Sequence, residues 1–197
     1  MKRILTVLSA CLILISCNQT GRQNNTIAGD ADAQVPAGKS MNEKETFLSA
    51  ISRYMTEIGT EYTQGEYCIP YFLIVAADTA SLDDIRVWGD FWVENYNLSG
   101  DTLKTVSGGS HPGCMHVKKT GDKYAVTQFD AVGDGSAFTS TAKAIFGDRY
   151  DALIALSSND EAKKAARAKS IIDYATAHNL RVSCYQDYGW PAVKLAQ

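Results

Sequence analysis

The sequence predicts an α+β domain in which a long N-terminal helix packs on an antiparallel β-meander of about five strands, with further helices at the C-terminus. Three observations predict this class. Apolar residues recur at helical spacing over residues 47–62, strand patterns follow one another closely over residues 84–132, and alanine-rich helical patterns begin near residue 140. Strands joined by short turns favour antiparallel hairpins over units in which a helix connects parallel strands.

The first 16 residues have the pattern of a secretory signal peptide. Lys2 and Arg3 form a positive start, and residues 4–15 are almost entirely apolar. This apolar run is too short to cross a bilayer as a helix, which needs about 20 apolar residues.

The motif that ends this segment is Leu14-Ile15-Ser16-Cys17. It resembles the lipobox of bacterial lipoproteins. The resemblance implies that residues 1–16 are removed, that Cys17 receives a diacylglyceryl group, and that the new amino group is acylated. Several acyl chains anchor a protein stably where one would not. In such lipoproteins an aspartate after the cysteine implies retention in the inner membrane, so Asn18 implies the outer membrane. The alternative is an ordinary secretory peptide.

Cys17 and a flexible tether are expected to occupy residues 17–40, followed by one globular domain over residues 41–197. The tether is rich in Asn, Gln, Gly, Ala and Asp and buries too little apolar surface to order itself. The formal net charge of −3 provides no basic footprint for nucleic acid. We therefore expect a membrane attachment through the lipid and no nucleic-acid partner.

The domain is expected to begin with a helix of about 20 residues. Ser40 and Glu43 fit a capping box, and the apolar stripe continues to Tyr62. Residues 67–77 then form a nearly continuous apolar run that favours a buried strand. Pro70 lacks an N–H for a sheet ladder, which favours an edge position or a bulge.

The richest strand pattern covers residues 84–98. Its two faces are both apolar, which predicts a central strand between two packed layers. One face carries Ile85, Val87, Phe91 and Val93, and the other carries Trp88, Trp92 and Tyr96. Further strands are expected at residues 102–107, 114–119 and 123–132, with a glycine-rich loop over residues 108–113.

Helices are expected over residues 140–146, 149–156 and 161–178, followed by a short strand over residues 181–185. The order of helix, meander and helices is similar to cystatin-like and NTF2-like folds. The segments Val87-Trp88-Gly89-Asp90-Phe91-Trp92 and Tyr188-Gly189-Trp190-Pro191 are also similar to uncharacterised envelope lipoproteins of this type. Neither resemblance implies an activity, because such folds host both enzymes and binding modules.

The residues best suited to chemistry are His111, Cys114 and His116. Imidazole and thiolate are good zinc ligands, although no fourth ligand is evident. Cys114 could also act as a nucleophile with a histidine base and an orienting acid such as Asp90 or Asp130. The simpler interpretation is one loop histidine and two strand side chains. We therefore predict no catalytic residue, no metal and no cofactor, and keep these three residues as weak candidates.

An aromatic set could line a ligand cavity. Aromatic walls with a few carboxylates suit a sugar ring or an apolar ligand. The candidate binding residues are Trp88, Asp90, Trp92, Tyr96, Tyr188 and Trp190. The alternative is that Trp88 and Trp92 belong to the core under the C-terminal helices and that Trp190 closes one end.

Three functions remain open at this point. The preferred hypothesis is a non-catalytic binding module of the cell envelope, with a small-molecule or glycan ligand or an envelope protein as its partner. The alternatives are a small hydrolase or metalloenzyme that uses Cys114 with His111 or His116, and a structural envelope protein with a sealed core. Cys68, Cys114 and Cys184 allow one disulfide at most.

Overall fold

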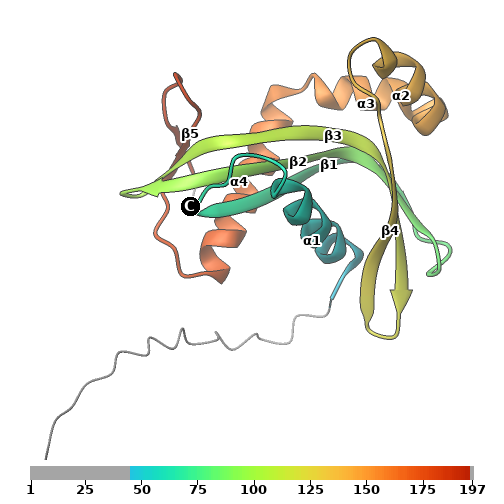
Figure 1. Cartoon of the computed structure of the whole chain (residues 1–197), viewed down its shortest axis with the longest axis horizontal. Coiled ribbons are helices and arrows are strands. Elements are labelled where there is room, and N and C mark those ends of the chain that lie inside the picture. Colours follow the sequence, from blue (N-terminus) through green and yellow to red (C-terminus); the bar gives the residue numbers. More distant parts are fainter. Residues whose placement is uncertain (1–44, 196–197) are drawn as a thin grey trace, which may run out of the picture. The chain divides into compact units, whose positions relative to one another are not determined.

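The computed structural model describes residues 45–195. The predicted signal peptide, Cys17 and tether lie outside these residues. The described chain combines helices with a sheet, which confirms the α+β class (Figure 1). Its elements are α1 (Phe47–Gly59), β1 (Tyr67–Asp78), β2 (Ile85–Ser99), β3 (Thr102–Thr120), β4 (Lys123–Ala131), a 3-10 turn (Gly135–Ala137), α2 (Phe138–Phe146), a second 3-10 turn (Gly147–Arg149), α3 (Tyr150–Ser157), α4 (Asp160–Ala177), β5 (Cys184–Gln186) and β6 (Val193–Lys194).

Within residues 45–195, every helix is too short or too polar to cross a membrane.

The sheet is mixed rather than purely antiparallel. Strands β1 to β4 form the expected antiparallel meander, each paired with the next along the chain. Strand β3 has a second pairing that the sequence does not predict, because its first residues, 102–104, pair in parallel with β5. Strand β6 then pairs with β5, so the sheet has six strands.

Strand β3 is one continuous strand of 19 residues, where two strands and a loop were expected. The glycines of residues 108–113 serve close packing instead of a turn. A Cβ atom at Gly109 would collide with the Tyr62 hydroxyl, and one at Gly108 would collide with the Glu94 carboxylate. Pro112 is tolerated because its carbonyl accepts the Val132 N–H at 2.9 Å on the outer side of β3. Its missing N–H therefore lies on that side and not toward β2.

Helix α1 is shorter than expected. Thr46 has extended backbone angles, with φ −120° and ψ 164°, so the helix begins at Phe47. Ser40 and Glu43, the expected capping box, lie outside the described residues. The Thr46 hydroxyl accepts the Ser49 N–H at 3.2 Å, and together these two residues form the capping box. The helix has 13 residues and ends at Gly59. The expected long N-terminal helix is therefore not what the structure shows.

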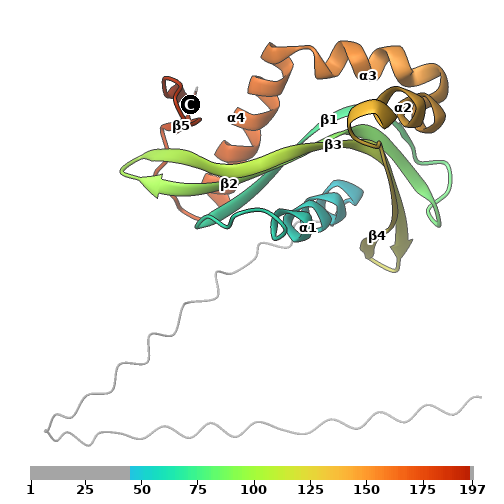
Figure 2. The ribbon, with the colours of Figure 1, turned by 45° about the horizontal axis from the view of Figure 1, so that its top comes forward.

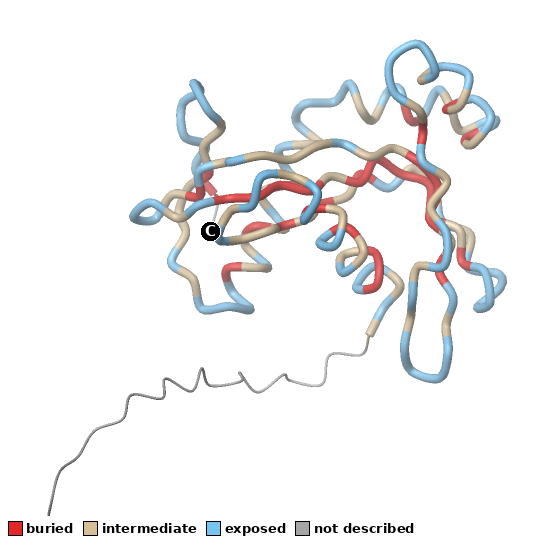
Figure 3. Tube along the Cα trace, viewed as in Figure 1, coloured by how far each residue is buried: buried red, intermediate tan, exposed pale blue. Residues whose placement is uncertain are grey.

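Strand β2 lies between two layers, as its sequence predicts. On one side, here called the α1 face, its apolar residues pack against Ile51 and Met55 of α1. On the other side, here called the α4 face, Trp88 packs with α2 and α3, and Tyr96 packs with Ile171 of α4. Figure 2 shows α1 and α4 on opposite sides of the sheet. The buried residues concentrate along the middle of the sheet (Figure 3).

The three C-terminal helices lie close to their predicted positions. The last one is capped by Asn159, whose Oδ1 accepts the Ala162 N–H at 3.0 Å. Helices α3 and α4 both contact β1, so together they cover the half of the α4 face that is formed by β1 and β2.

Candidate functional site

A buried arginine ties α4 to the sheet. Arg167 is 8% exposed, and its Nε donates to the Tyr96 hydroxyl at 2.8 Å. Its Nη1 and Nη2 donate to the two carboxylate oxygens of Asp187 at 3.0 and 2.8 Å. Nη2 also donates to Thr105 Oγ1 at 2.7 Å. This bidentate ion pair connects α4, β2, β3 and the residue that follows β5, and such paired geometry is the strong form of a salt bridge.

Glu94 lies on the same face without a matching partner. It is 7% exposed, and its carboxylate lies over Gly108. Within residues 45–195 no hydrogen bond to this carboxylate is found. Burial raises the pKa of Glu94 to about 7, and the nearby Arg167 lowers it only in part. Glu94 therefore exchanges a proton near neutral pH.

Asp90 and Trp92 complete this polar row of β2. Asp90 is 2% exposed and accepts hydrogen bonds from Ser110 Oγ at 2.5 Å and Ser157 Oγ at 3.3 Å. Trp92 stacks on Tyr71 with ring centroids 5.6 Å apart and an interplanar angle of 11°. Its indole N–H is buried and has no acceptor among the described residues. Buried N–H groups without an acceptor are uncommon in folded proteins, so this one indicates that the polar row has a role besides packing.

The predicted aromatic set does not form one cavity. Asp90, Trp92 and Tyr96 share the α4 face as expected. Trp88 lies further along this face, under α2, where its Nε1 donates to the Ile145 carbonyl at 3.0 Å. Tyr188 and Trp190 lie away from all of these, in the connection between β5 and β6. Trp190 therefore does not close the core.

This connection, residues 187–192, is called the hairpin loop below, and it presents two aromatic side chains to solvent. Tyr188 is 98% exposed and Trp190 is 71% exposed. The loop backbone is held, because the Trp190 N–H donates to the Asp187 carbonyl at 3.1 Å and Gln186 Nε2 donates to the Trp190 carbonyl at 2.9 Å. Gly189 supplies the φ of +78° that this turn needs.

The base of the hairpin loop is fixed by the buried ion pair described above, because Asp187 is the carboxylate that Arg167 binds. Figures 1 and 2 show the dark red segment that carries this loop projecting from the end of the sheet that is far from β4. The two aromatic rings are therefore exposed on a backbone whose position is set by the fold.

Cys114 and His116 do come together in a pocket of about 280 Å³ next to α2. Burial and the nearby Asp130 raise the pKa of Cys114 to about 11, so its thiol stays protonated. His116 Nδ1 lies 2.7 Å from Asp84 and its Nε2 lies 3.2 Å from Asp130. Burial lowers the pKa of His116, but these two carboxylates more than offset it and raise the pKa overall. A doubly bound imidazole of this kind has no free nitrogen to accept the thiol proton.

His111 lies on the opposite side of the sheet. Because β3 is continuous, residues 111 and 114 face opposite ways. The His111 Nε2 lies 2.9 Å from the Tyr62 hydroxyl, on the α1 face. Across residues 45–195, no group of three or more His, Cys, Asp or Glu side chains is arranged to hold a metal ion.

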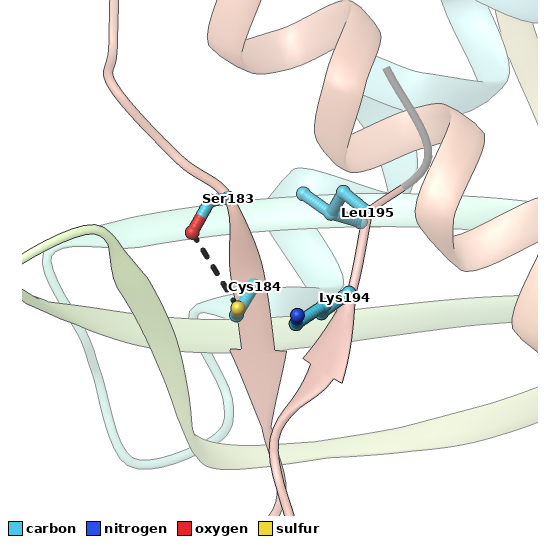
Figure 4. A pocket seen from close by; sticks show the side chains of 4 residues that line it. All are labelled: Ser183, Cys184, Lys194 and Leu195. Carbon is cyan, nitrogen blue, oxygen red and sulfur yellow. Dashed lines mark hydrogen bonds between the residues drawn. The ribbon is translucent and has the colours of Figure 1, made fainter.

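A second hollow of about 420 Å³ lies at the base of the β5–β6 hairpin (Figure 4). It is lined by Ser183, Cys184, Lys194 and Leu195, and Leu195 is the last residue that the structure describes.

The thiols of Cys68, Cys114 and Cys184 are all free. Cys68 contacts Gly59 of α1, whereas Cys114 packs under α2 on the opposite side of the sheet.

Comparisons of the chain with protein-family models, with curated proteins and with solved structures find no match.

Glu94 of β2, and its neighbours Arg167 of α4 and Tyr71 of β1, were not predicted as site residues. The sequence does indicate a position for Glu94. It follows Asp90 by four positions, so alternation places both carboxylates on the same face of the strand. Arg167 offered no such signal, because an arginine in an alanine-rich helix is most often solvated. Its partner, Asp187, lies 20 residues away and meets it only in the folded chain.

Proposed function

We propose that this protein is a non-catalytic binding module of the cell envelope, held by a lipid anchor at Cys17, and that the hairpin loop is its contact surface for a protein partner. The observation that carries the proposal is the pair of exposed aromatic rings, Tyr188 and Trp190, on a loop fixed by Arg167 and Asp187. Tyr, Trp and Arg are the residues most enriched at binding hot spots. A loop that is already fixed loses little conformational freedom when it binds.

The catalytic alternative has less support from the geometry. A thiol with a pKa of about 11 is a poor nucleophile at neutral pH. His116, its neighbour, is bound by carboxylates at both ring nitrogens, and His111 faces the other side of the sheet. A hydrolase that uses Cys114 would have to rearrange all three features.

The anchor and the outer-membrane location are part of the proposal and rest on the lipobox at residues 14–17 and on Asn18. They are tested by labelling cells with a radioactive fatty acid and separating the two membranes. The wild-type protein is expected to carry label and to fractionate with the outer membrane. A Cys17→Ser variant is expected to lose the label, and a labelled variant would contradict the assignment of Cys17.

The contact surface is tested by photo-crosslinking in the native cells. A photoreactive amino acid is placed at position 188, at position 190, or at position 82 as the control. Leu82 is also a large exposed apolar residue, 53% exposed, but it lies in the turn between β1 and β2. Positions 188 and 190 are expected to capture the same protein, and position 82 is not. Capture of the same protein from all three positions, or of none, would contradict the proposal.

A further inference from the structure

The outer edge of β3 is unpaired over residues 105–111. On that side, β5 pairs only with residues 102–104, and β4 pairs only from Gly113 onward. Among the described residues, no main-chain hydrogen bond reaches the outer side of β3 between these two ladders. Figures 1 and 2 show no strand beside this part of β3. The free edge is about 23 Å long, which is enough for a short added strand.

The direction of the free groups follows from Pro112. Its carbonyl points outward to Val132, and N–H and C=O groups alternate in direction along a strand. Ser110 and Gly108 therefore direct their N–H and C=O groups outward, whereas His111 and Gly109 bond to β2. Two features that natural proteins use to protect edges, a proline and a bulge, lie at the ends of this segment and leave its middle open.

The middle of the edge consists of small residues. Gly108, Gly109 and Ser110 present almost no side chain outward, so an approaching backbone would meet little steric obstruction. Helix α4 packs mainly against β1 and reaches β3 through Arg167, whose Nη2 donates to Thr105 Oγ1 at 2.7 Å at the end of this strip beside β5.

Carboxylates lie beside the free edge on the α4 face. Ser110 Oγ donates to Asp90 and Thr105 Oγ1 donates to Asp187, which also binds Arg167. Burial lowers the pKa of His111, while the carboxylates of Asp134, Asp90 and Glu61 act on it in the opposite direction.

Glu94 places a negative charge at one defined position along the free edge. Its carboxylate lies over Gly108, in the middle of the free edge, and is not hydrogen-bonded within the described chain. The nearby cation, Arg167, already binds Asp187 through two hydrogen bonds. The Glu94 carboxylate is largely withdrawn from water, and a second cation placed over Gly108 would favour its charged form.

We propose that the free edge of β3 binds an extended, cationic segment of the protein partner by strand addition, with one lysine or arginine of that segment paired to Glu94. Main-chain bonds to Ser110 and Gly108 would give affinity, and the pocket at Glu94 would give specificity for a cation. This inference rests on the proposed function, since it names the class of partner, but it uses a site separate from the hairpin loop.

The test measures the fluorescence anisotropy of two labelled hexapeptides added to the purified full-length protein in detergent. One alternates valine with lysine, and the other alternates valine with glutamate. The lysine peptide is expected to bind saturably and at least about tenfold more tightly than the glutamate peptide, because each correct charge pair is favoured and each like-charge pair is disfavoured. Equal binding of the two peptides would overturn the proposal.

Two variants of Ser110 distinguish the role of its main-chain N–H from that of its side chain. Ser110→Ala removes the hydroxyl and keeps the outward N–H, whereas Ser110→Pro removes both. The proline variant is expected to bind the lysine peptide about tenfold or more weakly than the alanine variant, since both lose the hydroxyl bond to Asp90 and only the proline variant also loses the N–H. Equal binding by the two variants would overturn the proposal. Glu94→Gln is expected to reduce the preference for lysine over glutamate.

Amide hydrogen exchange on the wild-type protein tests the same point without any variant. The amides of Gly108 and Ser110 are expected to exchange more slowly when the lysine peptide is bound. Slow exchange without peptide, together with a concentration-dependent dimer in sedimentation, would assign the edge to a second copy of this chain and overturn the proposal. Trp190→Ala is expected to leave peptide binding unchanged. A partner captured from position 190 but no peptide binding would reject this inference and leave the proposed function standing.

Discussion

The two faces of β2 are built from alternate residues of one strand, yet they are stabilised in different ways. The α1 face is mostly apolar: the Phe91 ring centroid lies 5.9 Å from that of Phe72 and 5.8 Å from that of Phe129, both edge to face. Asn95 is also buried there, and its Nδ2 donates to the Gly59 carbonyl of α1 at 3.0 Å. The α4 face buries Asp90 and Glu94, and Arg167 of α4 lies close enough to Glu94 to act on its charge. Buried ion pairs are a poor source of stability compared with apolar packing of the same volume. The charges of the α4 face therefore indicate a role in positioning and binding, whereas the α1 face indicates a structural core.

The largest difference between the two faces is expected when the cation of the α4 face, Arg167, is removed. Arg167→Met is expected to lower the free energy of unfolding by about 4 kcal/mol, because it leaves the buried Glu94 and the half-buried Asp187 without their cation and the Tyr96 hydroxyl without its donor. Chemical denaturation measures this loss. Lys164→Met removes a surface cation of the same helix and is the matched control, with no measurable change expected. Equal losses for the two variants would contradict the importance assigned to Arg167.

A smaller effect is expected on the α1 face. Ile51→Ala should lower the free energy of unfolding by about 3 kcal/mol, because it leaves a cavity beside fully buried residues. This loss should be the same from pH 5 to pH 8, since the variant changes no titrating group. A loss that varied strongly with pH would mean that the two faces are coupled.

Glu94 should show the opposite behaviour. Its carboxyl binds protons more tightly in the folded state, with a pKa of about 7 against the ordinary 4.5, so the stability of the wild type falls as pH rises from about 4.5 to 7. Tyr71 of β1, Asp187 and Arg167 are the charged or titrating groups that act on it besides its neighbours on β2.

Glu94→Gln removes this dependence. Relative to the wild type, the variant is expected to gain about 2 kcal/mol of stability between pH 5 and pH 8. Denaturation at each pH measures the difference. A stability difference that stayed constant with pH would show that Glu94 has an ordinary pKa.

His116 should give the smallest effect and the same direction of pH dependence by a different cause. Its pKa is raised by Asp84 and Asp130, so its stabilising contribution is complete below about pH 6.5 and is lost as pH rises through the folded pKa. His116→Gln should therefore destabilise the protein at pH 5 more than at pH 9. A larger loss at pH 9 would contradict the two carboxylate contacts.

Sequence patterns predicted the parts of this fold that depend on local periodicity. The alternation of Ile85, Val87, Phe91 and Val93 placed β2 between two layers, and the spacing of helical residues placed α2 to α4. The continuous course of β3 was hidden, because Gly108 and Gly109 look like turn residues until Tyr62 and Glu94 are seen to pack against them.

The candidate site was predicted only where its residues lie on one strand. Asp90, Trp92 and Tyr96 share a strand face, which alternation reveals directly. Arg167 and Asp187 join them only through the packing of α4 and the parallel pairing of β5, and no local pattern records either contact. No local pattern shows that His111 and Cys114 lie on opposite sides of the sheet, because this depends on β3 being one continuous strand.

The most direct test of this account is an NMR titration of the Glu94 side-chain carboxyl carbon in the folded protein. The account predicts a midpoint near pH 7, because the carboxylate is buried and lacks a partner, and a fall in that midpoint when the lysine peptide is added. A midpoint near 4.5 that does not respond to the peptide would contradict both the description of the α4 face and the binding edge inferred from it.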